Sequence, residues 1–180
     1  TLERSQTRDQ RTLLIKRSLM KNPLVLLLRH IALRRNESDT PHCLCPLDRI
    51  RTATVLVAPM QEDSDAVKSA VKQFFSYNNI PVNIISPENG ELNLAGAIKK
   101  KFRGERLPEG SGELLISLAD TDSMFWPEYE SRCSNACFKI GREKLKGGVF
   151  DLVILPSENG STPSQSAVFS EIKNYLNIIR

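Results

Sequence analysis

From residue 52 onward, short apolar runs alternate with segments of helical periodicity, and this alternation constrains the fold more than any other feature. The apolar runs predict five strands, at residues 52–58, 80–86, 113–119, 137–141 and 150–156. Helices are expected at residues 64–79, at 94–102, from Pro127, and after residue 162. Apolar strands that alternate with helices predict an α/β fold, a three-layer sandwich around a mainly parallel sheet.

The connection between the last two predicted strands departs from this pattern. Only residues 142–149 join them, whereas parallel neighbours usually need a crossover of a dozen or more residues. We therefore expect these two strands either to pair antiparallel through Gly147 and Gly148 or not to be neighbours. The prediction is a mixed five-stranded sheet with Arg142 at an edge.

Helix-start signals bound the last helix. Thr162, Pro163, Ser164 and Gln165 form a capping-box pattern with proline at the first helical position. In the predicted helix at 94–102, Leu94, Ile98 and Phe102 are expected to share one apolar face.

Basic residues are concentrated near the N-terminus. Residues 1–60 hold eleven Lys and Arg against five Asp and Glu, whereas residues 61–180 hold fourteen against sixteen. A near-neutral body argues against specific nucleic-acid binding, which requires a basic face. We assign residues 1–46 to a basic helical segment with its linker, and residues 47–180 to the α/β sandwich domain.

The basic segment reads as two helices separated at Asn22 and Pro23. The second helix carries an apolar stripe made of Leu24, Leu27, Leu28 and Ile31. Packing of this stripe on the sheet is the favoured interpretation. Peripheral contact with an anionic membrane surface and self-association into a homodimer are the alternatives.

The longest apolar run covers residues 23–28, which is far short of the roughly 20 residues that cross a bilayer. It also lacks the features of a signal-peptide core. Four cysteines in 180 residues do not form a disulfide scaffold. A cytoplasmic location is therefore expected, with the inner membrane face as the alternative.

Motifs for several kinds of catalysis are missing from the sequence. There is no G-x-S-x-G, no G-x-G-x-x-G and no P-loop, and the two histidines, His30 and His42, precede the predicted sheet. The turn after the first strand, PMQEDSD, is acidic and would repel a phosphate group. No cofactor is expected.

Polar residues follow the predicted strands, at the edge where open parallel sheets bind ligands. Carboxylates after the first and third strands could form an acidic rim that holds a divalent cation, although roles as turn and cap residues are favoured. Trp126 could line a pocket or close the end of the core. The candidate pocket residues are Glu62, Asp63, Asp120, Asp122, Ser123, Trp126, Arg142, Ser157, Glu158 and Asn159.

The cysteines are candidates for a zinc site. Cys43 and Cys45 form a C-x-C pair beside His42, and Cys133 and Cys137 form a C-x₃-C pair. Structural zinc sites usually pair cysteines that are separated by two to four residues. Buried or incidental thiols are favoured.

A series of structural segments covers residues 114–116, 134–141, 150–152 and the helix that carries Ile172, Tyr175 and Leu176. With the basic N-terminal helix, this series resembles a family of small uncharacterised α/β proteins from Bacteroidetes. The resemblance covers residues 10–180 and implies a domain of unknown function, with no catalytic residues to carry over.

A second, shorter likeness involves Asp120, Arg132, Ser134 and residues 138–141. These positions are similar to the N-terminal half of heptosyltransferase-type glycosyltransferases. The nucleotide-sugar-binding second domain and the Gly-rich acceptor loop of those enzymes have no counterpart in this sequence.

The sequence therefore favours a non-catalytic cytosolic α/β domain that binds a protein partner or a small ligand. The alternative is a small enzyme or metal-binding protein that uses the acidic strand-end residues in glycosyltransferase-like or phosphoester chemistry.

Overall fold

The computed structural model describes residues 22–103, 114–121, 124–155 and 163–179. Its contacts divide the chain into two units, Thr1–Asn36 and Glu37–Arg180. In the first unit, helix α2 (Pro23–Asn36) is described. The second unit contains the sheet and the helices packed on it.

The second unit is built on a five-stranded sheet in which every pair of neighbours is parallel. The strands are β1 (Ala53–Leu56), β2 (Val82–Ile85), β3 (Leu114–Ser117), β4 (Phe138–Gly141) and β5 (Leu152–Val153). Their order is β2-β1-β3-β4-β5, one of the common orders of doubly wound sheets. The predicted α/β class is confirmed. The strand order reverses direction between β1 and β3.

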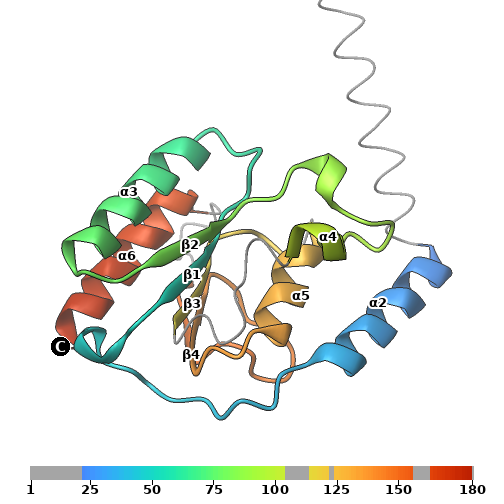
Figure 1. Ribbon diagram of the computed structural model, residues 1–180, viewed down its shortest axis with the longest axis horizontal. Helices are drawn as coiled ribbons and strands as arrows, with labels where there is room; N and C mark the ends of the chain where they lie inside the picture. The colour runs from blue at the N-terminus through green and yellow to red at the C-terminus, as the bar shows by residue number, and fades with distance from the viewer. Residues whose placement is uncertain (1–21, 104–113, 122–123, 156–162, 180) are drawn as a thin grey trace, which may run out of the picture. The chain divides into compact units, whose positions relative to one another are not determined.

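Helices cover both faces of this sheet (Figure 1). Helices α3 (Ser64–Tyr77) and α6 (Gln165–Ile178) lie against one face, and α5 (Phe125–Cys133) and the short α4 (Lys100–Arg103) lie on the other. Two 3₁₀ turns, η1 (Leu47–Arg49) and η2 (Asn89–Glu91), complete the described elements. No helix within the described ranges is both long enough and apolar enough to cross a membrane.

The face under α3 and α6 is apolar throughout. Side chains alternate between the two faces of a strand, so alternate positions of β1, β3 and β4 meet the two helices in one cluster. Its fully buried members include Val55, Val67, Val71, Phe75, Leu114, Ile116, Phe138, Ile140, Phe169 and Ile172. This cluster is the main core of the second unit.

The opposite face combines apolar and polar side chains. Leu56 and Ile85 pack with Trp126 of α5, while Leu115 packs with Phe150. The same face carries Thr54, Ser117 and Lys139, all of which are buried. The two faces of one sheet therefore differ in polarity.

The expected mixed sheet is wrong at one connection, because β5 lies parallel beside β4. Ile140 pairs with Leu152, and Gly141 pairs with Val153. Only two residues pair, so the chain has to return past about two or three residues of β4 rather than the length of a full strand. The connection that leads into β5 can therefore stay short and needs no helix.

Two predicted helix boundaries also need correction. Gly96 has a φ of 86°, which is a left-handed conformation, and α4 begins only at Lys100. Leu94 is consequently 87% exposed and shares no helical face with Ile98. In α6 the N-cap is Ser164, whose side chain accepts a hydrogen bond from the Ala167 amide, and Thr162 lies outside the described residues.

Candidate functional site

The carboxyl ends of parallel strands meet at one edge of the sheet, and the loops after β1, β3 and β4 place most of the described candidate residues there. Glu62 and Asp63 follow β1, Asp120 follows β3, and Arg142 follows β4. In doubly wound sheets this edge binds ligands at the point where the strand order reverses. The contacts of these residues decide what this edge can do.

Arg142 follows β4 at this edge but is buried, so the prediction of a solvent-exposed residue there is wrong. Its Nη1 donates to the Leu118 carbonyl oxygen at 3.0 Å, and its Nη2 donates to the Pro163 carbonyl oxygen at 2.9 Å. The side chain is 6% exposed. The guanidinium therefore links the end of β3 to the start of α6, and its planar shape suits two separate acceptors.

Asp63 lies at the N-terminus of α6. Its Oδ2 accepts a hydrogen bond from the Ser166 amide at 2.8 Å, an amide that no earlier turn of the helix can satisfy. Burial raises the pKa of the Asp63 carboxyl, but hydrogen bonds from Ser166 and Gln165 outweigh this effect and lower the pKa below its ordinary value. Asp63 therefore acts as an ionised second cap beside Ser164.

Gln165 and Glu143 complete the fixed parts of this edge. The fully buried Gln165 amide accepts from the Ala58 amide at 2.8 Å and donates to the Ala58 carbonyl oxygen at 3.2 Å. Glu143 accepts a hydrogen bond from the Thr121 amide. Both side chains bond main-chain groups of neighbouring loops, which holds those loops in place.

The remaining candidates fall into three groups. Glu62 is exposed and Asp120 is half-buried at the carboxyl edge, whereas Trp126 is 1% exposed within a core cluster. The structure thus brings Asp63 and Arg142 to the start of α6 and places Trp126 in the core. Asp122, Ser123, Ser157, Glu158 and Asn159 lie outside the described residues.

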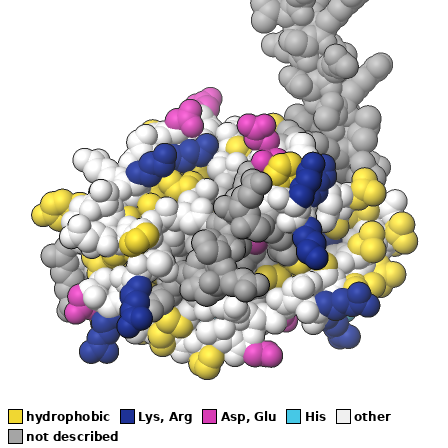
Figure 2. Space-filling view, in the orientation of Figure 1, with side chains coloured by type: hydrophobic (Ala, Val, Ile, Leu, Met, Phe, Trp, Pro, Cys, Tyr) yellow, Lys and Arg dark blue, Asp and Glu magenta, His cyan; other side chains and the backbone are white. Residues whose placement is uncertain are grey.

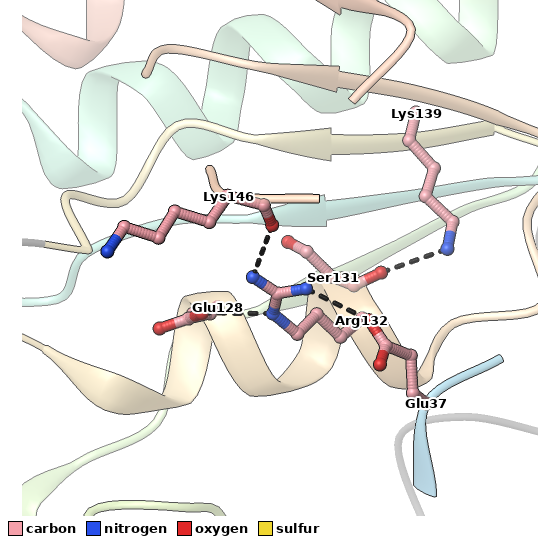
Figure 3. Close-up of polar contacts among 6 residues, drawn as sticks. All are labelled: Glu37, Glu128, Ser131, Arg132, Lys139 and Lys146. Carbon is pink, nitrogen blue, oxygen red and sulfur yellow. Dashed lines mark hydrogen bonds and ion pairs between the residues drawn. The ribbon is translucent and has the colours of Figure 1, made fainter. Parts of the chain in front are cut away.

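A second polar cluster lies near the amino ends of β4 and β5, centred on Arg132 of α5 (Figure 3). Its Nε donates to Glu128 at 2.9 Å and its Nη1 donates to Glu37 at 2.9 Å. Its Nη2 donates to the Lys146 carbonyl oxygen at 2.7 Å. One side chain therefore ties α5 to the start of the second unit and to the loop before β5.

Residues 37–43 run beside the end of α5 and the start of β4. The Ser38 amide donates to the Arg132 carbonyl oxygen at 2.9 Å, and the Cys43 amide donates to the Cys137 carbonyl oxygen at 2.8 Å. His42 Nδ1 lies 2.9 Å from Asp151 Oδ1. This segment is therefore bound to the rest of the second unit along its length.

Lys139 is the buried ammonium of this region and is 2% exposed. Its Nζ donates to the Ser131 carbonyl oxygen at 3.0 Å (Figure 3). Burial lowers the pKa of Lys139, and the nearby Asp151 carboxylate opposes that shift only in part. The buried charge of Lys139, in the layer between α5 and the sheet, therefore lowers the stability of the folded protein.

The described residues contain no group of three or more His, Cys, Asp and Glu that could hold a metal ion. Cys43 is exposed, and Cys45, Cys133 and Cys137 are half-buried. The main-chain bond between Cys43 and Cys137 brings the two predicted cysteine pairs near each other.

Sequence reasoning did not identify the roles of Arg132, Gln165 or Lys139. Apart from the Arg132–Glu128 pair within α5, each bonds a group that is distant in the sequence or in another element. Two local signals were available: the i,i+4 spacing of Glu128 and Arg132, and the capping pattern around Ser164, which places Gln165 at the first turn of a helix.

No family model, curated protein or solved structure matches this chain. The resemblance to the Bacteroidetes family therefore stays a prediction.

Proposed function

We propose that this protein is a non-catalytic α/β domain that binds a protein partner at the carboxyl edge of its sheet. The proposal rests on the hydrogen bonds that the polar side chains at that edge make. Asp63, Arg142, Glu143 and Gln165 each bond main-chain groups of adjoining loops. Groups fixed in this way use their hydrogen bonds to hold adjoining loops and build a rigid surface.

Apolar exposure at the same edge supports binding. Met60, in the loop after β1, is 77% exposed, and Leu155, after β5, is 68% exposed. Exposed apolar side chains held by a rigid scaffold are typical anchors of protein interfaces. Met in particular adapts to partner surfaces of different shape.

A site-specific photo-crosslinker tests this proposal. Benzoylphenylalanine is introduced at Met60 and, in a matched control, at Tyr77, which is 83% exposed at the C-terminal end of α3. In the cells that make the protein, we expect one discrete protein adduct from position 60 and none from position 77. Equal adducts from both positions, or none from position 60, would contradict the proposal.

Metal analysis and turnover assays test the enzymatic alternative. Purified protein is expected to carry no stoichiometric metal and to turn over no phosphoester or nucleotide sugar. Metal or turnover that is lost in an Asp120→Ala, Asp122→Ala double variant would show instead that the acidic strand ends perform chemistry.

A further inference from the structure

The first unit differs from the second in charge. Residues 1–36 hold nine Lys and Arg against two Asp and Glu, a net charge of +7. The other 144 residues hold sixteen against nineteen, a net charge of −3. Residues 10–36 contain no acidic residue at all. The excess positive charge therefore belongs to one short segment.

Helix α2 carries three of these nine basic residues, Arg29, Arg34 and Arg35, together with exposed apolar side chains (Figure 2). Leu24 is 64% exposed and Leu27 is 54% exposed, and Leu26, Leu28 and Ile31 are exposed as well. These side chains occupy the first two turns and the start of the third. Arg34 and Arg35 form the basic last turn, and no acidic residue lies in the first turn.

We propose that α2 docks the protein on an anionic membrane surface. The exposed apolar side chains of α2 enter the boundary between headgroups and acyl chains. Arg34 and Arg35 stay among the anionic headgroups, where long basic side chains extend toward the polar layer. Basic residues next to a membrane contribute attraction that salt weakens, so apolar burial and charge act together.

Charge decides between a membrane and a second copy of the chain. Two copies of α2 in contact would bring two basic segments together, and the like charges would oppose the dimer. An anionic surface neutralises the same charges. Helix α2 thus carries exposed leucines in its first two turns, and its arginines lie at position 29 and in the last turn.

Vesicle co-sedimentation of the full chain tests this docking. Vesicles contain either phosphatidylcholine alone or phosphatidylcholine with phosphatidylserine. We expect sedimentation with the anionic vesicles only, with at least tenfold weaker partition at high salt. Leu24→Ser, Leu27→Ser and Arg34→Glu, Arg35→Glu double variants should each lose at least tenfold in partition.

Two matched controls keep the result specific. Lys72→Glu, Lys100→Glu makes the same change of charge at exposed sites in the second unit, and Leu94→Ser, Ile178→Ser removes exposed apolar side chains there. Both should keep their partition to within about twofold. Each variant is checked by thermal unfolding, so that loss of folding is not mistaken for loss of binding.

Three results would overturn the inference. The first is full-length protein that ignores anionic vesicles. The second is partition that falls as much in the control variants as in the α2 variants. The third is a dimer in light scattering that the Leu24→Ser, Leu27→Ser change converts to monomer without any effect on vesicles, which would assign the apolar residues to a second copy.

Discussion

The two faces of the sheet are formed by the same five strands but differ in the polarity of their buried side chains. Under α3 and α6, the positions of β1, β3 and β4 are apolar and buried. Under α5, the alternate positions include Thr54, Ser117 and Lys139. The register brings Asn83 of β2 beside Thr54 on this second face. Adjacent residues of a strand thus belong to two different environments.

Hydrogen bonding shows what this difference costs. Five buried side-chain atoms of the described residues have no hydrogen-bond partner, and three of them, Asn83 Nδ2, Ser117 Oγ and Ser131 Oγ, lie on or beside this second face. Each such group costs about 1–3 kcal/mol. The apolar face should therefore supply most of the free energy of folding, while the polar face should contribute less per residue buried.

The largest expected effect is on the apolar face. Phe138→Ala removes a fully buried ring from β4 and should lower the free energy of unfolding by about 3–5 kcal/mol because it leaves a cavity. Urea unfolding at neutral pH measures the change. A loss below about 1 kcal/mol would mean that this face does not dominate stability.

The second effect concerns close packing on the polar face. A Cβ at Gly141 would overlap the ring of Phe150, so Gly141→Ala should cost about 1–3 kcal/mol. Gly90→Ala is the matched control, because a Cβ there meets nothing within 4 Å. If both variants unfold at the same urea concentration, Phe150 moves aside freely and this face is loosely packed.

A third effect tests the cap that anchors α6 on the apolar face. Asp63→Ala should cost about 1 kcal/mol at neutral pH, and its exposed neighbour Glu62→Ala should cost little. The pKa of Asp63 is lowered in the folded protein, so its contribution is present above the unfolded pKa of about 4 and is lost as the pH falls through the lower folded value. Unfolding measured from pH 7 to pH 2 should show the Asp63→Ala difference shrinking, and a difference independent of pH would exclude the ionised cap.

The smallest effect is expected next to the largest, at Lys139. Lys139→Met should change stability by less than about 1 kcal/mol at neutral pH, since removing a buried charge offsets the lost bond to Ser131. Because the pKa of Lys139 in the folded protein lies below 10.5, the folded protein loses the Lys139 proton at a lower pH than the unfolded chain does. The wild-type protein should therefore gain stability relative to Lys139→Met as the pH approaches 10.5. The Lys72→Met change, at an exposed site, should show no such gain. A stability difference between the wild-type protein and Lys139→Met that does not change with pH would show that Lys139 is not buried as an ammonium.

The strands were predictable because their signal is local. The run at 52–58 contains β1, the run at 113–119 contains β3, and the run at 137–141 contains β4. A β-branched or aliphatic run buried on both faces reads directly from the sequence. The positions of Asp63 and Arg142 after strands were predictable for the same reason, because the end of an apolar run in the sequence marks the end of the strand.

The contacts of those residues were not predictable. Arg142 reaches the carbonyl oxygens of Leu118 and Pro163, and nothing near position 142 indicates either acceptor. The pairing of β4 with β5 was predicted wrongly because crossover length assumes strands of ordinary length, and β5 has only two residues.

The sequence by itself determined the α/β class, the place of most strands and the concentration of basic residues near the N-terminus. Only the tertiary structure decided which polar side chains are held by hydrogen bonds and on which face of the sheet the buried polar residues lie. Periodicity and composition depend on residues that are close in the sequence, whereas the partners of Arg142 and Gln165 are distant main-chain groups that only the fold brings within about 3 Å.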